Sequence, residues 1–221
     1  MKKALILDLD NTIYPVSAIA DNLFGKLFAV LDDYSGMINM GDDDRVAKIK
    51  EEMTRRPFQY IADKYELDKE LNDKMVDTLR TMTYDLPMRP FDDYHHLRQI
   101  PLDKFLVTTG FVKLQMSKVK QLGIEQDFKD IYIVDPDVNS KTKKDVFADI
   151  MQKHHYQASD LLVIGDDPDS EIKAALELEI DTFLFDPNGI YPGANSTHKS
   201  DHLKKVSDII AGLPSNILPG T

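Results

Sequence analysis

The stretch ALILDLDNTIYP, residues 4–15, holds two aspartates, Asp8 and Asp10, directly after a run of apolar residues. The run Ala4–Leu7 is continuously apolar, which is typical of a strand that other elements cover on both faces. In an extended segment Asp8 and Asp10 point to the same side, so two like charges lie close together where the strand ends. Such a pair is unfavourable unless a cation neutralises it. The stretch therefore predicts a buried strand with a charged site at its end.

Further short apolar runs follow later in the chain, and they are Phe105–Val107, Ile131–Val134, Leu161–Ile164 and Thr182–Phe185. Stretches with the apolar period of a helix lie between and after them, at Lys113–Leu122, Lys143–His154, Glu171–Leu178 and around Leu203–Ala211. Strands that alternate with helices predict an α/β fold. We expect a doubly wound, Rossmann-like parallel sheet with helices on both faces.

Residues 16–89 break this alternation, because they contain amphipathic stretches but no comparable strand run. The apolar positions of these stretches are Leu23, Leu27, Val30 and Leu31, then Val46, Ile49 and Met53, then Leu71, Met75 and Leu79. Arg55-Arg56-Pro57 predicts a break between two of the helices, since the residue before a proline disfavours helical geometry. We expect one α/β core, residues 1–15 and 90–221, with a helical domain, residues 16–89, inserted after the first strand.

Composition excludes several classes of function. The chain has 221 residues and a formal net charge of -11, which argues against binding to nucleic acid polymers or anionic membranes. It has no cysteine, which suits a reducing cytoplasm. It also has no apolar run of the roughly 20 residues that a membrane-spanning helix needs. We expect a cytoplasmic protein whose partner is a small molecule.

Polar residues follow the apolar runs at the points where the predicted strands end. They are Asp8 and Asp10 after the first run, Thr108-Thr109-Gly110 after the second, Asp135 and then Ser140-Lys141 after the third, and Gly165-Asp166-Asp167 with Glu171 after the fourth. In an open parallel sheet, ligands bind outside the carboxyl ends of the strands. These side chains are therefore expected to meet in one crevice.

Their chemistry suits phosphoryl transfer. Clustered carboxylates need a cation, and Mg²⁺ prefers a few carboxylates, water and phosphate oxygens, so Asp8, Asp166 and the Asp10 carbonyl are candidate ligands. Asp8 can attack phosphorus as a nucleophile, and Asp10 can move a proton to the leaving oxygen and from water. Thr108, Lys141 and the backbone N–H groups after Asp8 can neutralise the transferring oxygens. The expected phosphate contacts are therefore Leu9, Asp10, Thr108, Thr109 and Lys141, and the expected metal ligands are Asp8, Asp10, Asp166 and Glu171.

These residues resemble the four motifs of the haloacid dehalogenase superfamily phosphatases. Its first motif, Asp-x-Asp-x-Thr, is matched by residues 8–12, its second by Thr108, its third by Lys141, and its fourth by Gly165-Asp166 with Glu171. The family commonly has Asp where Glu171 stands, and Pro after the third-motif lysine, where Thr142 stands. Lys143 and Lys144 are alternative candidates for that lysine. The resemblance implies a Mg²⁺-dependent phosphatase with an aspartyl-phosphate intermediate, and it makes residues 16–89 a type-1 helical cap.

Residues 8–15, Asp-Leu-Asp-Asn-Thr-Ile-Tyr-Pro, are also similar to the pyrimidine 5′-nucleotidase branch of this superfamily. That similarity implies a nucleoside 5′-monophosphate substrate. True haloacid dehalogenases lack the second aspartate of the first motif, so Asp10 argues against C–halogen cleavage, in which the leaving halide needs no proton. A phosphotransferase or phosphomutase on the same site is an alternative, and so are sugar phosphates or phosphoglycolate as substrates.

Four residues near these motifs have competing interpretations. Asp167 precedes Pro168 and Asp169, and this pattern favours a negative charge at a helix start, with a metal-ligand role as the alternative. Arg55 and Arg56 are interpreted as a solvated pair, since arginines are mostly exposed. Tyr14 is interpreted as a packing residue where the inserted helices begin.

Overall fold

The computed structural model describes residues 1–38, 43–138 and 140–212. Within them, six strands form one parallel sheet in the order β3-β2-β1-β4-β5-β6. The strands are β1 (Ala4–Leu7), β2 (Asp103–Thr109), β3 (Asp130–Val134), β4 (Leu161–Gly165), β5 (Asp181–Phe185) and β6 (His198–Ser200). The expected doubly wound α/β fold is confirmed. After β3 the chain crosses to β4 on the other side of β1, which makes the end of β1 the switch point of the sheet.

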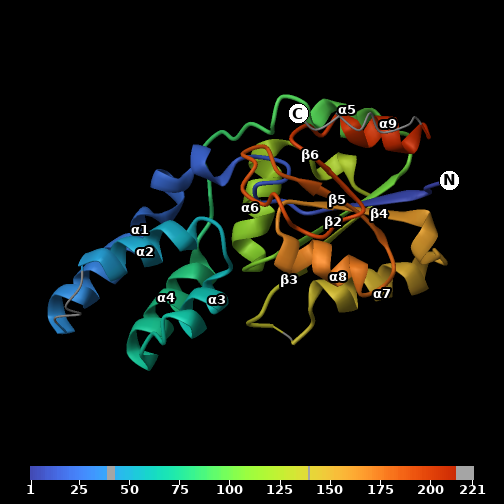
Figure 1. Cartoon of the computed structure of the whole chain (residues 1–221). Coiled ribbons are helices and arrows are strands. Elements are labelled where there is room, and N and C mark those ends of the chain that lie inside the picture. Colours follow the sequence, from blue (N-terminus) through green and yellow to red (C-terminus); the bar gives the residue numbers. More distant parts are fainter. Residues whose placement is uncertain (39–42, 139, 213–221) are drawn as a thin grey trace.

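Alternate residues of the central strands face the two layers of helices. Leu5 and Leu7 belong to one apolar cluster and Ala4 and Ile6 to a second one. The first cluster includes side chains of α5 (Tyr94–Gln99), α6 (Val112–Leu122) and α9 (Lys205–Ile210). The second includes side chains of α7 (Lys143–His154) and α8 (Lys173–Leu176). Figure 1 shows α5 and α9 above the sheet and α7 and α8 below it, so both faces of the sheet are buried.

The inserted segment is helical, as expected. It forms α1 (Ala20–Ile38), α2 (Asp43–Met53), α3 (Phe58–Lys64) and α4 (Lys69–Thr81), which project to one side of the sheet (Figure 1). The expected break at Arg55-Arg56-Pro57 lies between α2 and α3. The sequence did not predict α3, because its seven residues are too few to display a helical period.

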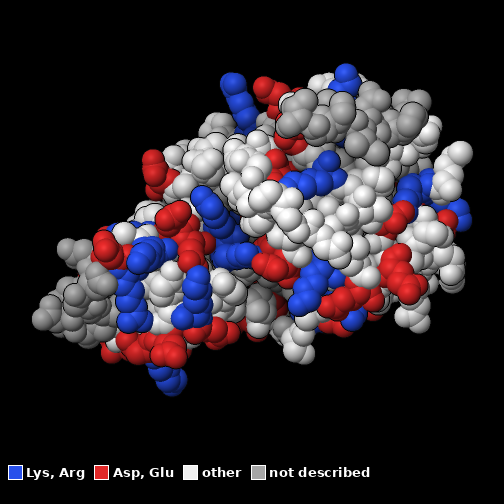
Figure 2. Space-filling model, viewed as in Figure 1, with Lys and Arg blue, Asp and Glu red and all other residues white. Residues whose placement is uncertain are grey.

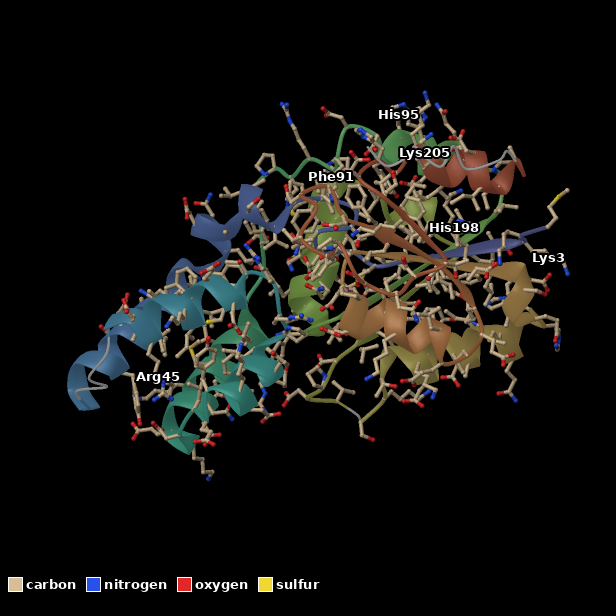
Figure 3. All side chains as sticks on the ribbon, viewed as in Figure 1. Lys3, Arg45, Phe91, His95, His198 and Lys205 are labelled. Atoms are coloured by element: carbon tan, nitrogen blue, oxygen red, sulfur yellow. The ribbon has the colours of Figure 1, made fainter. Side chains whose placement is uncertain are left out.

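The two chain connections to the inserted helices lie side by side. The amide of Phe91, which is labelled in Figure 3, donates to the Ile13 carbonyl at 2.8 Å. The Phe91 ring packs edge-on against Phe185 at 5.1 Å between centroids. Asn11 takes a left-handed φ of 55°, which asparagine tolerates, and its side chain accepts from the Val16 amide at 3.1 Å. The apolar core of the inserted helices is continuous with the first cluster of the sheet.

Lysines and arginines of the inserted helices alternate with acidic side chains on the visible surface (Figure 2). Lys64 lies 2.7 Å from Glu52, and Lys50 lies 2.6 Å from Asp32. Exposed pairs of this kind contribute at most about 1 kcal/mol each. The helices are therefore held mainly by their shared apolar core.

Two elements differ from the sequence-based expectation. β6 is a short polar strand at the sheet edge, so no apolar run announces it. The helix expected at Glu171–Leu178 instead consists of the end of a π-type turn, Pro168–Ile172, followed by α8, and the turn has a non-helical backbone at Ser170. No helix among the described residues is long and apolar enough to span a bilayer. Residues 213–221 of the predicted core lie outside the described residues.

Candidate active site

The site lies at the carboxyl edge of the sheet. Leu7 is in register with Leu106 on β2 and with Ile164 on β4, so the residues that follow these three positions line up side by side. The Asp8 amide donates to the Ile164 carbonyl at 3.0 Å, which extends the ladder by one residue and fixes the start of the loop after β1. Asp8 is therefore level with Gly165, and Asp166 lies one residue further along on the neighbouring strand.

Three carboxylates meet there, and we call Asp8, Asp166 and Glu171 the acid cluster. Their carboxylate oxygens lie within 4.8 Å of one another, and Asp8 and Glu171 are buried. Thr12 donates to Asp166 Oδ1 at 3.1 Å. A Cβ atom on Gly165 would lie 2.1 Å from Glu171 Oε1, so this glycine leaves the space that the Glu171 carboxylate occupies.

Lys143 is the cation of the acid cluster. Its Nζ lies 2.7 Å from Asp8 Oδ1 and 2.6 Å from Glu171 Oε2, and only 8% of its side chain is exposed. Thr142 caps α7 in a capping box with Asp145, which makes Lys143 the first helical residue. Side chains on a helix tilt toward its N-terminus, so Lys143 reaches back to the strand ends.

The assignment of the site lysine to Lys141 is therefore corrected. Lys141 precedes the cap of α7, and its half-exposed side chain pairs with Asp149 at 2.5 Å. Lys144 points to Glu177, 2.9 Å away on the surface. Of the three candidates, the structure brings only Lys143 to Asp8.

The acid cluster carries an excess of negative charge, because three carboxylates face one ammonium group. Burial, opposed by Lys143, raises the pKa of Asp8 from 3.8 to about 7. Burial and the charges of Glu171 and Asp8 raise the pKa of Asp166 well above its ordinary value. Closely spaced carboxylate oxygens with two uncompensated charges suit a hard divalent cation, and Mg²⁺ is such a cation. The residues present therefore fit a magnesium site.

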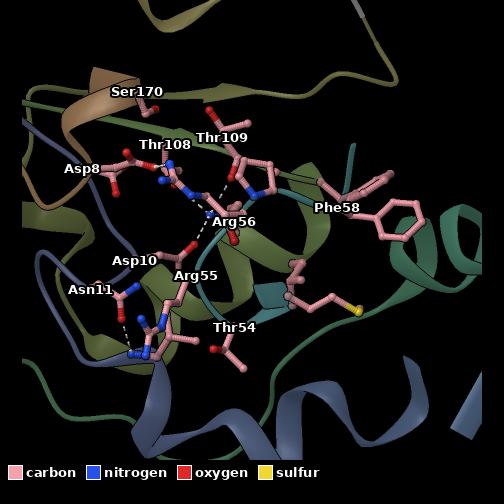
Figure 4. A pocket seen from close by; sticks show the side chains of 18 of the residues that line it. Asp8, Asp10, Asn11, Thr54, Arg55, Arg56, Phe58, Thr108, Thr109 and Ser170 are labelled. Atoms are coloured by element: carbon pink, nitrogen blue, oxygen red, sulfur yellow. Dashed lines mark hydrogen bonds and ion pairs between the residues drawn. The ribbon is translucent and has the colours of Figure 1, made fainter. Parts of the chain in front are cut away.

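Asp10 has the opposite environment. Its carboxylate accepts from Lys118 Nζ at 2.8 and 3.1 Å, from Gln115 Nε2 at 2.9 Å and from the Tyr14 hydroxyl. Burial acts to raise the pKa of Asp10, but Lys118 and the hydrogen bonds hold it below its ordinary value. We call Tyr14, Gln115 and Lys118, with the carboxylate that they hold, the Asp10 clamp. Asp8 and Asp10 occupy separate parts of the pocket wall (Figure 4).

The remaining predicted phosphate contacts lie close to the clamp. Thr108 is buried and its hydroxyl accepts from Gln115 at 2.7 Å, while Thr109 lines the pocket. The Leu9 side chain is buried in the apolar core, so only its backbone can face the site. Tyr14 packs in the core as expected, but its hydroxyl also reaches Asp10.

The sequence reasoning did not single out Gln115 and Lys118. A signal was present, because both residues lie on the buried face of α6 among Leu114, Val119 and Leu122. Polar groups in an apolar stripe need partners there, so they point to a buried polar network.

The pocket above these residues has a charged floor and an apolar wall. The inserted helices and the segments beside them supply most of this wall, together with two residues of the core: Val16, Leu23, Phe24, Leu27, Met53, Phe58, Leu79, Phe111 and Leu114. Polar residues from the turn between α2 and α3 border the same space, among them Thr54, Arg55 and Arg56 (Figure 4).

Arg56 connects the inserted helices to the core, which corrects its interpretation as a solvated residue. Its guanidinium pairs with Asp167 and, at 3.3 Å, with Asp169, and 22% of its side chain is exposed. Asp167 also accepts from the Asp169 amide at 2.9 Å, which confirms its predicted place as the charge that begins the turn after β4. Arg55 is more exposed, at 58%, and lies 3.8 Å from Glu51.

Comparisons with known proteins agree with this fold. A family model described as haloacid dehalogenase-like hydrolase matches residues 2–178. A haloacid dehalogenase-like family protein from Streptococcus pneumoniae has a TM-score of 0.70 at 17% identity, over 95% of this chain and 98% of the other. A HAD phosphatase from Thermococcus onnurineus has a TM-score of 0.63 at 19% identity, over 97% and 100% of the two chains.

L-2-haloacid dehalogenase from Xanthobacter autotrophicus shares the fold as well, with a TM-score of 0.59 at 14% identity, over 97% of this chain and all of the other. The search of curated protein sequences found no match. The family model covers most of the chain, and its range includes β1, the inserted helices, β4 and the acid cluster. The protein therefore belongs to the haloacid dehalogenase-like hydrolases.

Proposed function

We propose that this protein is a Mg²⁺-dependent phosphomonoesterase that forms an aspartyl-phosphate on Asp8. The observation that carries the proposal is the contrast between two carboxylates only two residues apart. Asp8 lies in the acid cluster, which has an excess of negative charge, whereas Asp10 is held by its own lysine. A cation bound at the acid cluster would keep Asp8 ionised as a nucleophile, whereas Asp10, held outside that cluster, would be placed for proton transfer.

In the first step of the proposed reaction, a carboxylate oxygen of Asp8 forms a bond to phosphorus. The bond between phosphorus and the leaving oxygen breaks, and that oxygen takes a proton from the Asp10 carboxyl. The negative charge of a bound phosphate ester favours the protonated form of a neighbouring carboxyl, which is how Asp10 is supplied with this proton. The products of the step are an alcohol and an acyl phosphate on Asp8.

In the second step, Asp10 acts as a base. Its carboxylate takes a proton from water, the water oxygen bonds to phosphorus, and the bond between phosphorus and Asp8 breaks. Inorganic phosphate leaves, Asp8 is again a carboxylate, and Asp10 has regained its proton. The two steps return Asp8 and Asp10 to their starting states and need no redox partner.

The other residues would neutralise charge. Asp8, Asp166, Glu171 and the Asp10 carbonyl would hold Mg²⁺. When bound, Mg²⁺ would stabilise the charge on the transferring phosphoryl oxygens. Lys143 would hold Asp8 in place and add a fixed positive charge beside the same oxygens. The Thr108 hydroxyl would donate to one of them.

Asp10 favours phosphate esters over haloacids as substrates. A halide leaves without a proton, so a dehalogenase has no use for an acid at this position, whereas an alkoxide leaving group needs one. This distinction matters because the chain also shares its fold with a haloacid dehalogenase. The clamp fixes the position of the Asp10 carboxyl, which a group that transfers a proton requires.

For the leaving group, we propose a nucleoside 5′-monophosphate. Two features support this choice, the similarity of residues 8–15 to the pyrimidine 5′-nucleotidase branch and the apolar wall that Phe24, Phe58 and Phe111 contribute to the pocket. A planar base can pack against such a wall. The inserted helices would then act as a cap, with proposed bounds 16–89, that excludes water and selects the leaving group.

A panel of phosphate esters tests the proposal. The wild-type protein and Asp8→Asn are assayed with Mg²⁺ on pyrimidine and purine monophosphates, sugar phosphates, phosphoglycolate and an L-2-haloacid. We expect inorganic phosphate from the wild type in the presence and absence of other alcohol acceptors, and none from Asp8→Asn. Halide release without ester hydrolysis would overturn the proposal, and phosphoryl transfer to the added alcohols in place of water would identify a phosphotransferase.

A further inference from the structure

The Asp10 carboxylate borders the pocket, yet protein side chains donate hydrogen bonds to both of its oxygens. Oδ1 accepts from Tyr14 and from Lys118, and Oδ2 accepts from Gln115 and from Lys118. The donors come from two different elements, the loop after β1 and helix α6. Because both oxygens are engaged from two directions, the carboxyl plane cannot rotate without the loss of at least one hydrogen bond.

Lys118 is the strongest of these restraints. Only 5% of its side chain is exposed, and its Nζ lies 6.0 Å from the centre of the Tyr14 ring. A lysine is almost never fully buried unless it is paired, and here Asp10 is its partner. Two other lysines of α6, Lys113 and Lys120, are exposed, which shows that the helix itself does not require a buried cation.

Gln115 couples Asp10 to the second predicted phosphate contact. Its Nε2 donates to Asp10 Oδ2 at 2.9 Å and to Thr108 Oγ1 at 2.7 Å. Gly110 leaves room for it, since a Cβ atom at that position would lie 3.1 Å from the Gln115 side chain. Gly110 also has a φ of 148°, which side chains rarely adopt. The clamp therefore fixes Asp10 and Thr108 relative to each other.

From this geometry we infer that Lys118 is a positioning residue for proton transfer, and that with Gln115 and Tyr14 it holds the Asp10 carboxyl apart from the acid cluster. The inference rests on the proposed function. Without the clamp, the Asp10 side chain is free to turn toward the cationic side of the site, at Lys143 and the predicted Mg²⁺. An acid or base must lie within hydrogen-bond reach of the proton that it moves, so a misplaced carboxyl slows the reaction even though it is present.

The test compares two leaving groups. Lys118→Met removes the ammonium and keeps the apolar stem, and Lys120→Met makes the same change at an exposed position of α6. Each variant is assayed on p-nitrophenyl phosphate, whose phenolate leaves without a proton, and on an alkyl phosphate, whose alkoxide needs one. We expect Lys118→Met to lower kcat/KM about 100-fold on the alkyl ester and less than about 5-fold on the aryl ester. The comparison uses kcat/KM because this ratio reports the steps up to departure of the leaving group, whereas kcat also contains the hydrolysis step that the two esters share. Lys120→Met should match the wild type on both.

Equal losses of kcat/KM on the two esters would overturn the inference, because Lys118 would then support the fold or bind substrate directly. Tyr14→Phe removes one donor and keeps the ring, so it gives a smaller loss with the same selectivity for the alkyl ester. That variant decides the question if Lys118→Met does not fold. A wild-type protein without activity on either ester would overturn the proposed function itself, which distinguishes that failure from the failure of the clamp.

Discussion

Asp8 of the acid cluster and Asp10 of the clamp are only two residues apart after β1, yet their carboxylates have opposite electrostatic surroundings. In the acid cluster, three carboxylates share Lys143, and burial raises the pKa of Asp8 to about 7. In the clamp, Lys118 and two hydrogen-bond donors serve one carboxylate and hold its pKa below the ordinary value. The negative charge of the acid cluster needs a further cation to balance it, whereas Lys118 balances the charge of Asp10. Aspartates of the same motif can therefore take different roles, because the groups around them differ.

Removal of the proposed nucleophile should have the largest effect on activity. Asp8→Asn retains the shape of the side chain but cannot form an acyl phosphate. We expect kcat to fall by about 10⁴-fold or more, since loss of a nucleophile removes the chemical step itself. Steady-state assays on the best ester of the panel measure this, and residual activity above about one hundredth of the wild type would contradict it.

Asp10→Asn should have the next largest effect. The amide cannot move a proton, so kcat/KM on an alkyl ester should fall by about 10²–10⁴-fold, the usual range for general acid–base catalysis. The kcat/KM on an aryl ester should fall less, because its leaving group needs no proton and the shared hydrolysis step does not enter this ratio. The ratio of the two losses is the informative quantity, and a ratio near one would mean that Asp10 has no proton-transfer role.

Glu171→Gln should weaken metal binding at the acid cluster without a direct effect on the Asp10 clamp. It removes one negative charge from the acid cluster and leaves the clamp unaltered. We expect the affinity for Mg²⁺ to fall by about 10–100-fold in a calorimetric titration. Glu177→Gln, an exposed position at the end of the same segment, serves as the control and should keep the wild-type affinity. Equal affinities for all three proteins would show that Mg²⁺ does not bind at the acid cluster.

The stability of the metal-free protein should also depend on pH through Asp8. Its pKa is raised from 3.8 to about 7, so between these values the folded chain binds more protons than the unfolded chain. The free energy of unfolding therefore decreases as the pH rises through this window. Denaturant unfolding in the presence of a chelator should show this decrease in the wild type and a weaker one in Asp8→Asn. Saturating Mg²⁺ should offset it, and parallel profiles for the two proteins would contradict the account.

The smallest expected effect concerns Arg56, whose partner Asp167 is next to the acid cluster. Arg56→Met removes an ion pair between the inserted helices and the core, and partly exposed pairs contribute at most about 1 kcal/mol. We expect a decrease of that size in the free energy of unfolding at low salt, and less at high salt. Arg55→Met, at a more exposed side chain, should have almost no effect. Equal effects of the two substitutions on the free energy of unfolding would contradict the role of Arg56 as the arginine that connects the inserted helices to the core.

Much of the fold followed from local sequence. The run Ala4–Leu7 and the expected helix Lys143–His154 coincide with β1 and α7, because continuous apolarity and helical period are local signals. β6 and α3 were not predicted, since a short polar edge strand and a seven-residue helix carry no comparable pattern.

The site was predictable where it depends on strand ends and less so where it depends on packing. The convergence of Asp8, Asp166 and Glu171 followed from the rule for parallel sheets. Lys143 was a candidate but was not preferred, because the choice depends on where Thr142 caps the helix. The roles of Lys118 and Arg56 depend on which distant carboxylates face them, and only the folded chain determines that.

The proposed aspartyl-phosphate on Asp8 can be trapped and located in the chain. The wild-type protein is mixed with Mg²⁺ and a ³²P-labelled ester, quenched in acid within one turnover, and digested for peptide mass analysis. We predict labelled phosphate on the peptide that contains Asp8, in an amount that decreases when the hydrolysis is allowed to proceed. Rapid ester hydrolysis with no labelled protein at any quench time, or label on a different residue, would contradict the account.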